Sequence, residues 1–405
     1  ATVGDDGGGA LLANPAAIAR RSGKRGELGM VFVDDELDWQ SATEGAPSVH
    51  DQAPSSVAPH AAAFASAGNW TFGLAVMTSA VSRRPPRRTR DAAHPPNTEV
   101  ARAVSDGGVA GGVRRDTVTA GLARRFGGSR ALGIAVGASR VSVIEIRRLW
   151  AGFSGRDDIG SALNDLGIGF EGADAFVPSL VGGLLFIAED SPLELGASLG
   201  WIDRARISAD VVAIGTRPMG PSSSPDQSRA VLDYQFPPTA RAGARYVGTR
   251  FVGELGGEVA LARRSAEDTE WKIQGMQVID GPSGATADLT RVPSRISLRT
   301  HGAIRGSVDV ELIEGFLWAT AGYAHVIGSV TKQKQSPTFG DLGGDTLGLG
   351  LEGKAAGFTF TLGWSRTWAG ARKVDQSALV LDNPFASGDA PVPAREAIAA
   401  LLPAL

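Results

Sequence analysis

The clearest strand pattern in this chain is Phe358-Thr359-Phe360-Thr361-Leu362-Gly363-Trp364-Ser365. Large apolar residues occupy every second position, and small or polar residues occupy the positions between them. Side chains of a strand point alternately to its two faces. The stretch is therefore predicted to be a strand with one broad apolar face and one small, polar face.

The same contrast recurs elsewhere along the chain. Examples are Trp70-Thr71-Phe72-Gly73-Leu74 and Leu193-Glu194-Leu195-Gly196. Arginine, serine or histidine takes every second position in Arg295-Ile296-Ser297-Leu298-Arg299-Thr300-His301. Apolar residues on the outside and polar residues on the inside are typical of a β-barrel in a lipid bilayer.

The composition narrows the class of protein. The chain has 405 residues, a formal net charge of -3 and no cysteine. The net charge gives no electrostatic basis for nucleic-acid binding, and the lack of thiols excludes disulfides and cysteine-based sites. No apolar run approaches the roughly 18 residues that a membrane-spanning helix needs, so helical membrane proteins are excluded.

The alternation predicts about thirteen antiparallel strands in one up-and-down barrel, an all-β fold. They cover residues 27–40, 58–66, 69–82, 115–126, 130–146, 175–188, 193–213, 238–249, 251–263, 293–311, 316–328, 345–353 and 357–370. Short turns alternate with long outer loops at 41–57, 83–114, 147–174, 214–237, 264–292 and 329–344. Outer-membrane barrels sort their turns and loops in this way between the two rims.

Both ends of the chain lie outside the strand pattern. Residues 1–26 are expected to form an irregular or partly helical plug, and the barrel is expected to occupy 27–370. An odd number of strands does not close a bacterial single-chain barrel. Because 371–405 contains no good closing strand, we expect a loop or tail there and a missing final strand.

Several motifs together resemble the FadL-type outer-membrane transporters of long-chain fatty acids and other hydrophobic compounds. In chain order they are Asp5-Asp6 with Asn14-Pro15-Ala16, Pro59-His60 before Trp70-Thr71-Phe72, Leu193-Glu194-Leu195-Gly196, Phe236-Pro237-Pro238 before Arg241 and Arg245, and Thr346-Leu347-Gly348-Leu349-Gly350-Leu351. Each motif is weakly specific, and their order along nearly the whole chain carries the resemblance.

The resemblance implies a fourteen-strand barrel whose lumen is blocked by an N-terminal hatch. Asn14, Pro15 and Ala16 look like the hatch motif of that family. The family's residues before the Asp-Asp pair, which reach into its ligand pocket, are absent here, so we expect a truncated start. That departure puts transport by this chain in question.

Catalytic and metal-binding patterns are scarce. The five histidines have no metal-binding spacing. His301 is expected to point into the lumen beside Arg295 and Arg299, where the three form a polar network. We therefore expect no enzyme activity, no cofactor and no bound metal.

The expected outer loop 147–174 contains a candidate ligand surface. Residues 158–166 are predicted to form a short capped helix with one apolar side. The apolar candidates in this loop are Phe153, Ile159, Leu163, Leu166 and Phe170. In the resembled family two long outer loops form a hydrophobic groove, and this loop has the position of one of them. Alternatively, the helix folds over the barrel mouth and buries its own apolar side.

The preferred hypothesis is passive uptake of hydrophobic small molecules, such as long-chain fatty acids or other hydrocarbons, by a monomer in the bacterial outer membrane. Its partners would be the apolar ligand and membrane lipid, without nucleic acid. An arginine such as Arg241, Arg245, Arg295 or Arg299 is a candidate for holding a carboxylate head group. The alternatives are a plugged structural or assembly barrel without transport, a general diffusion porin, and a soluble β-rich protein.

Overall fold

The computed structural model describes residues 3–20, 22–40, 48–52, 55–84, 110–150, 165–188, 191–215, 222–223, 228–263, 269–279, 286–294, 298–331, 334–335 and 341–371. Nearly all of these residues belong to antiparallel strands, as predicted. The described helices are α1 (Ala10–Ala13) and the 3-10 helix η1 (Pro15–Arg20). Within the described part, no helix has both the length and the apolar character required to cross a bilayer.

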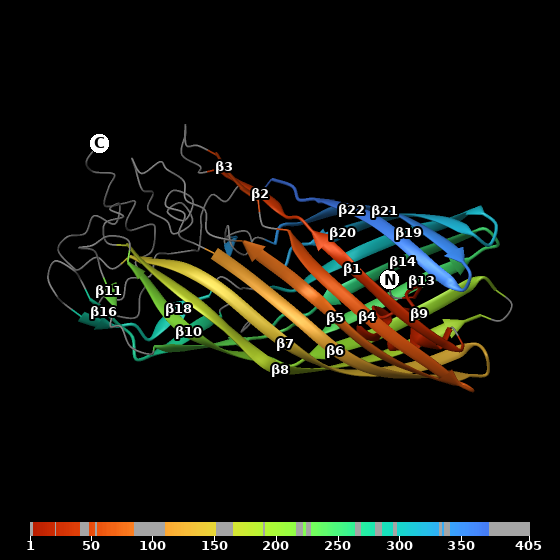
Figure 1. Ribbon diagram of the computed structural model, residues 1–405, viewed down its shortest axis with the longest axis horizontal. Coiled ribbons are helices and arrows are strands. Elements are labelled where there is room, and N and C mark those ends of the chain that lie inside the picture. Colours follow the sequence, from red (N-terminus) through yellow and green to blue (C-terminus); the bar gives the residue numbers. More distant parts are fainter. Residues whose placement is uncertain are drawn as a thin grey trace.

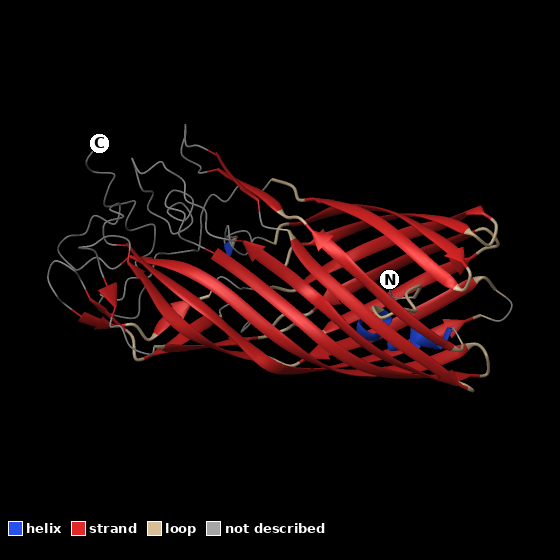
Figure 2. Cartoon of the chain, viewed as in Figure 1, coloured by secondary structure: helices blue, strands red, loops and turns tan. Residues whose placement is uncertain are grey.

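Among the described residues, thirteen strands pair in chain order and build the wall of a barrel (Figures 1 and 2). They are β1 (Lys24–Val33), β4 (Ser56–Ala67), β5 (Trp70–Arg84), β6 (Ala110–Phe126), β7 (Arg130–Trp150), β8 (Asp165–Ile187), β9 (Leu193–Ile202), β13 (Thr239–Val247), β14 (Phe251–Ala260), β19 (His301–Ile313), β20 (Leu317–Ile327), β21 (Gly343–Ala355) and β22 (Phe358–Trp368). The count agrees with the prediction from alternation.

Short turns lie at one rim and long connections at the other. In Figure 1 the turns are at the right end, where for example β6 and β7 are joined by Gly127-Gly128-Ser129. Gly127 and Gly128 have φ of 57° and 80°, a conformation that glycine adopts without steric cost. The end with the short turns is called the turn rim below.

Large apolar side chains cover the outer face of the wall. Phe358, Phe360, Leu362 and Trp364 of β22 are between 55% and 74% exposed. Their register neighbours on β21, such as Leu349 opposite Trp364, are also exposed. No second layer of protein covers these rows within the described residues. So extensive an apolar surface requires an apolar environment.

The described wall has two open edges, β1 and β22. β1 pairs with β4 and β22 pairs with β21, and no pairing joins β1 to β22 within the residues that the structure describes. Apart from Ala371, the predicted tail at 371–405 lies outside those residues. The plug was predicted to extend to residue 26, but β1 begins at Lys24, where Lys24 pairs with Ala65.

Four further strands continue the sheet beyond the middle of the barrel, away from the turn rim. They are β10 (Ala205–Gly215), β12 (Arg229–Tyr234), β15 (Glu270–Gln274) and β18 (Arg291–Pro293). β8 pairs with β9 along its later half and with β10 along its earlier half, so the chain path from β9 to β10 is one strand interrupted at Asp203 and Arg204. Small accessory sheets are formed by β2 (Glu36–Gln40) with β3 (Ser48–Gln52), and by β11 (Ser222–Ser223), β16 (Gln277–Ile279) and β17 (Thr286–Asp288).

The inner faces of β7, β8, β10, β12, β15 and β18 enclose a dry apolar core, here called the outer core. Phe170 stacks on Trp271 with a centroid distance of 4.6 Å. The indole nitrogen of Trp271 and the hydroxyl of Ser294 each donate to Oε2 of Glu145 at 2.8 Å. Glu145 also lies 3.7 Å from Arg147 (Oε1 to Nη1), and both residues are fully buried. The charged pair is thus enclosed among apolar side chains and hydrogen-bond donors.

Several predicted loop boundaries were wrong. β7 continues through Arg147–Trp150, β8 begins at Asp165, and the predicted loop at 264–292 contains β15 to β18. The predicted strand 27–40 is divided into β1 and β2, and the predicted strand 293–311 begins at His301. The outer face of the wall carries a belt of exposed apolar side chains, here called the apolar belt, and β7 and β8 continue beyond it. Past the belt, polar and apolar side chains no longer alternate as they do in a strand that faces lipid. The alternation therefore did not reveal the ends of these strands.

Candidate functional site

Residues 3–20 lie inside the barrel near the turn rim, where Figure 2 shows α1 and η1 enclosed by the strands of the wall. This stretch is called the N-terminal segment below. Its apolar side chains, including Leu11, Ala16 and Ile18, form a buried cluster with inward residues of the wall such as Phe64 and Val181. Many wall residues of this cluster are alanines: Ala62, Ala75, Ala123, Ala131 and Ala135. Small side chains on the wall leave the room that the segment fills.

The predicted hatch motif lies at the junction of α1 and η1. Asn14 is almost fully buried, and its side-chain Nδ2 donates to the carbonyl oxygen of Leu184 in β8 at 3.0 Å. Its Oδ1 accepts the backbone N–H of Ala16 at 3.2 Å. Pro15 begins η1, a position that suits a residue without an N–H donor. The motif therefore turns the chain and attaches it to the wall at the same point.

Two glycines of the wall allow this close approach. A Cβ atom at Gly133 of β7 would meet the backbone of Pro15 and Ala16, with Ala16 Cα at 2.7 Å. A Cβ atom at Gly183 of β8 would overlap Asn14 Oδ1 and lie 3.0 Å from Pro15 Cδ. Any larger residue at either position would displace the N-terminal segment.

Charged residues of the wall hold the later end of the segment. Nη2 of Arg20 lies 2.6 Å from Oε2 of Glu194, which also accepts from Nη1 of Arg245 at 3.1 Å. Nη2 of Arg125 donates to the carbonyl oxygen of Ala19 at 2.7 Å. Burial lowers the pKa of Arg20, although Glu194 acts in the opposite direction.

Arg241 links the middle of the segment to the opposite part of the wall. Its Nη1 donates to the carbonyl oxygen of Leu12 at 3.2 Å, and its Nε donates to Oε2 of Glu258 at 2.6 Å. Arg305 approaches the same Glu258 oxygen at 3.5 Å. Arg241 and Arg245 were candidates for holding a carboxylate head group, but in this structure both bind protein groups.

Two carboxylates bind the first residues of the segment. Glu254 accepts the backbone N–H of Val3 at 3.1 Å and that of Gly4 at 2.8 Å. Glu27 accepts the backbone N–H of Gly8 at 2.8 Å. Burial raises the pKa of Asp5, and the nearby Glu27 and Asp6 act in the same direction, whereas the hydrogen bond from Gly7 N–H opposes them.

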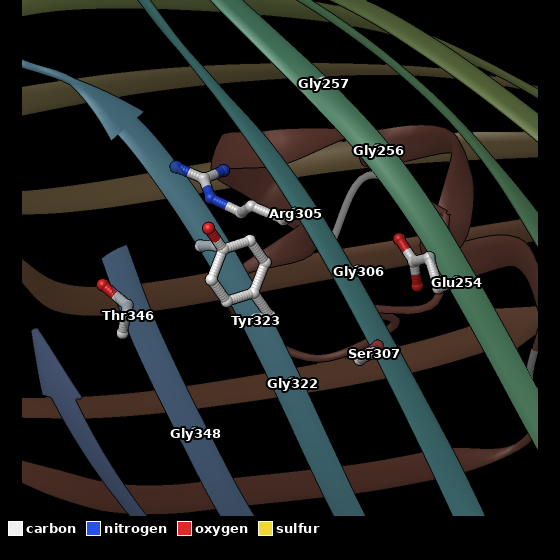
Figure 3. Close-up of a pocket in the computed structure, with 11 residues that line it drawn as sticks. Glu254, Gly256, Gly257, Arg305, Gly306, Ser307, Gly322, Tyr323, Thr346 and Gly348 are labelled. Carbon is white, nitrogen blue, oxygen red and sulfur yellow. The ribbon is translucent and has the colours of Figure 1, made fainter. Parts of the chain in front are cut away.

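A cavity of about 240 Å³ lies on the inner side of β14, β19, β20 and β21 (Figure 3). Its side chains include Glu254, Arg305, Ser307 and Thr346, which come from three of these strands. Glycines on the same strands, Gly256, Gly322 and Gly348, provide the remaining space. Because Glu254 also binds Val3 and Gly4, the cavity borders the start of the N-terminal segment.

The predicted ligand surface lies only partly within the described residues. Phe153, Ile159 and Leu163 lie outside the described residues. Leu166 and Phe170 belong to β8 and are fully buried in the outer core. The helical spacing of Ile159, Leu163 and Leu166 concealed the strand alternation of Leu166, Ile168 and Phe170.

The predicted polar network is described only in part. Arg295 lies outside the described residues, and Arg299 precedes β19 and donates from Nε to the carbonyl oxygen of Gly328 at 3.0 Å. His301 Nδ1 lies 2.9 Å from the carbonyl oxygen of Arg299. Nearby Asp341 is desolvated, which raises its pKa, but hydrogen bonds from Ser329 and Gly343 outweigh this effect and hold the pKa below its usual value.

The interior charges that bind the segment were mostly missed from the sequence: Glu27, Arg125, Glu194 and Glu254. Glu258, which binds Arg241, and Arg305, which approaches Glu258, were also missed. Their signal was present, because Glu254 and Glu258 lie four residues apart on one face of a strand, as do Arg241 and Arg245. In the described part of the chain, no group of three or more histidine or acidic residues is arranged to hold a metal ion.

Solved structures share this fold. The toluene transporter TodX of Pseudomonas putida matches with a TM-score of 0.65 and 16% identity, over 89% of this chain and 87% of that chain. The toluene transporter TbuX of Ralstonia pickettii matches with a TM-score of 0.64 and 13% identity, over 89% of both chains. A FadL homologue of Pseudomonas aeruginosa has a TM-score of 0.60 and 14% identity, over 88% of this chain and 85% of that chain.

No protein-family model and no curated protein sequence matches the chain. At these identities the structural likeness establishes the fold alone. The motifs indicated a resemblance to FadL-type barrels, and the structural comparison confirms this resemblance for the fold.

Proposed function

We propose that this chain is a bacterial outer-membrane barrel for passive uptake of hydrophobic small molecules. The observation that carries the proposal is a barrel with an apolar outer face and an interior occupied by residues 3–20. An occupied interior distinguishes a selective transporter from an open pore. TodX and TbuX, which share the fold, are toluene transporters.

The ligand would move from the outer side towards the cavity beside the N-terminal segment. The cavity of about 240 Å³ exceeds the roughly 150 Å³ that holds a benzene molecule in a small protein. Burial of each methylene group contributes about 0.8 kcal/mol, so an acyl chain or aromatic ring needs no charged partner to leave water. The barrel would act as a monomer, with membrane lipid around its wall.

In this account the N-terminal segment is the hatch. It is bound by polar contacts near its start, middle and end, while its apolar side chains pack into an alanine-lined recess. Each of these polar contacts involves a charged group and contributes about 1.5 to 3 kcal/mol. A segment held in this way can be displaced in parts without unfolding the barrel.

Uptake measurements test the proposal. Cells that lack their own hydrocarbon transporters would express the full chain and be given radiolabelled toluene or oleate. Expression should raise the initial uptake rate above that of vector-only cells, while a labelled sugar of similar size enters at the background rate. Equal uptake with and without the protein would favour a structural barrel.

A diffusion pore is the second candidate, and one observation favours it. The inward side of β22 carries Thr359, Thr361, Ser365 and Thr367, all exposed to the lumen side. Such a surface suits small polar solutes. A pore would give steady ion conductance in planar bilayers, whereas a barrel blocked by the N-terminal segment should give little.

A further inference from the structure

The outer face of β7, β8 and β9 near the turn rim has a groove of about 310 Å³. Its outward lining consists of apolar side chains and one arginine, Arg130. Leu132, Leu184, Phe186 and Leu195 stand 41% to 55% exposed around it. This face is separate from the lumen and from the contacts of the N-terminal segment.

Strand register arranges these side chains in three rows across the sheet. The row nearest the turn rim is Phe126, Arg130, Phe186 and Leu195, the second is Arg124, Leu132, Leu184 and Ala197, and the third is Leu122, Ile134, Gly182 and Leu199. Ala197 and Gly182 are the small members, and a Cβ atom at Gly182 would meet nothing within 4 Å. A depression therefore begins near Arg130 and runs away from the turn rim, between the leucine side chains of the second and third rows.

The charges on this face have one sign. The three rows contain Arg124 and Arg130 and no acidic residue. The Arg124 guanidinium lies 4.9 Å from the ring centre of Trp70 and 4.8 Å from that of Phe126. Among the described residues, no carboxylate forms an ion pair with Arg130. Arg250 at the same rim does form an ion pair, since its Nη2 lies 3.5 Å from Oε2 of Glu314.

We propose that this groove binds one phospholipid, with an acyl chain along Leu132, Leu184 and Ala197 and the phosphate on Arg130. The occupant must be apolar along its length and anionic at its end. A phosphate-bearing lipid of the leaflet at the turn rim meets both conditions, since arginine donates two parallel hydrogen bonds to phosphate. The proposal requires that the barrel lies in a membrane, but it does not depend on transport.

Native mass spectrometry of the full chain in mild detergent tests the site, with dioleoyl-phosphatidylglycerol as the probe. Wild type should retain one lipid molecule. Arg130→Gln should weaken binding about fivefold, which corresponds to one arginine contact at a membrane surface. Ala197→Phe should abolish retention because the ring fills the groove.

Matched variants control for general effects. Arg250→Gln removes a charge at the same rim, and Ala321→Phe adds a ring to the outer face of β20, so both should bind like wild type. Circular dichroism confirms that each variant is folded. Equal binding by Arg130→Gln and Arg250→Gln would overturn the proposal, as would equal retention of dioleoylglycerol, which lacks the phosphate.

Discussion

Single residues decide whether the N-terminal segment can lie against the wall. Gly183 faces Asn14 and Pro15, while the adjacent Gly182 faces outwards into open space. Both positions are glycines, and they are adjacent on the same strand, but they lie on opposite faces of the wall. They therefore isolate the effect of close approach.

Replacing Gly183 by alanine should displace the N-terminal segment, because the new methyl group overlaps Asn14. Overpacking of this kind costs about 1 to 3 kcal/mol. The expected result is a severalfold rise in conductance across planar bilayers. Gly182→Ala is the control and should conduct like wild type; a rise for both variants would show that the substitution acts on the strand, not on the contact.

The Asn14 side chain bonds both to the wall, at Leu184, and to the N-terminal segment itself, at Ala16. Asn14→Ala removes the donor to Leu184 and the acceptor of Ala16 N–H, which leaves the buried backbone N–H of Ala16 without this partner. The cost should be about 1 to 3 kcal/mol. Limited proteolysis should then cleave the segment faster than in wild type. Asn69→Ala, in the exposed turn between β4 and β5, should not change the cleavage rate.

At the scale of elements, the sequence predicted the strand segments of the apolar belt well. It predicted poorly the strand segments of the outer half of the barrel, away from the turn rim. In the belt, residues such as Phe358 to Trp364 face two different environments, so their polarity alternates. In the outer half, Leu166, Ile168 and Phe170 face the outer core, and the residues between them are glycines. Glycine gives no polarity signal, so the helical spacing of Ile159, Leu163 and Leu166 led to the prediction of a helix.

The same limit applies to the candidate site. The Asn14-Pro15-Ala16 motif was found because three residues lie together in the chain. The wall residues that bind the segment are separated from it by up to 251 positions, as in the contact of Val3 with Glu254. Such pairs depend on barrel closure and register, which a single sequence does not specify.

The outer core yields a prediction about stability. Phe170→Ala removes the ring that stacks on Trp271 and should cost about 3 to 5 kcal/mol. Phe176→Ala, on the same strand but 68% exposed, should cost much less. Urea unfolding in lipid vesicles, followed by circular dichroism, measures both. If Phe170→Ala altered ligand uptake and left stability unchanged, Phe170 would instead be a ligand residue as first expected.

The N-terminal segment should also respond to pH through Asp5. Its pKa is raised in the folded protein, mainly by burial, so protonated Asp5 favours the docked segment. This contribution is complete below the unfolded pKa and is lost as pH rises through the folded pKa. Conductance should therefore increase as the pH rises through the folded pKa of Asp5. Asp5→Asn should reduce this dependence, and an unchanged profile would contradict a role for Asp5.

At the scale of the whole molecule, the two faces of the wall should tolerate charge differently. Leu362 faces outwards and Thr361 faces the lumen on the same strand. Arginine on the lipid face of a barrel costs about 2 to 4 kcal/mol near the bilayer centre. Leu362→Arg should lower folding yield into lipid vesicles, whereas Thr361→Arg should fold like wild type.

The central claim is that the exposed apolar rows contact lipid. The chain has no cysteine, so single cysteines from Phe358 to Ser365 can each carry a nitroxide without a competing site. In proteoliposomes, collision rates with oxygen should peak at 358, 360, 362 and 364, and rates with a water-soluble nickel chelate should peak at 359, 361, 363 and 365. Uniform rates, or the reverse alternation, would contradict a barrel that spans the membrane.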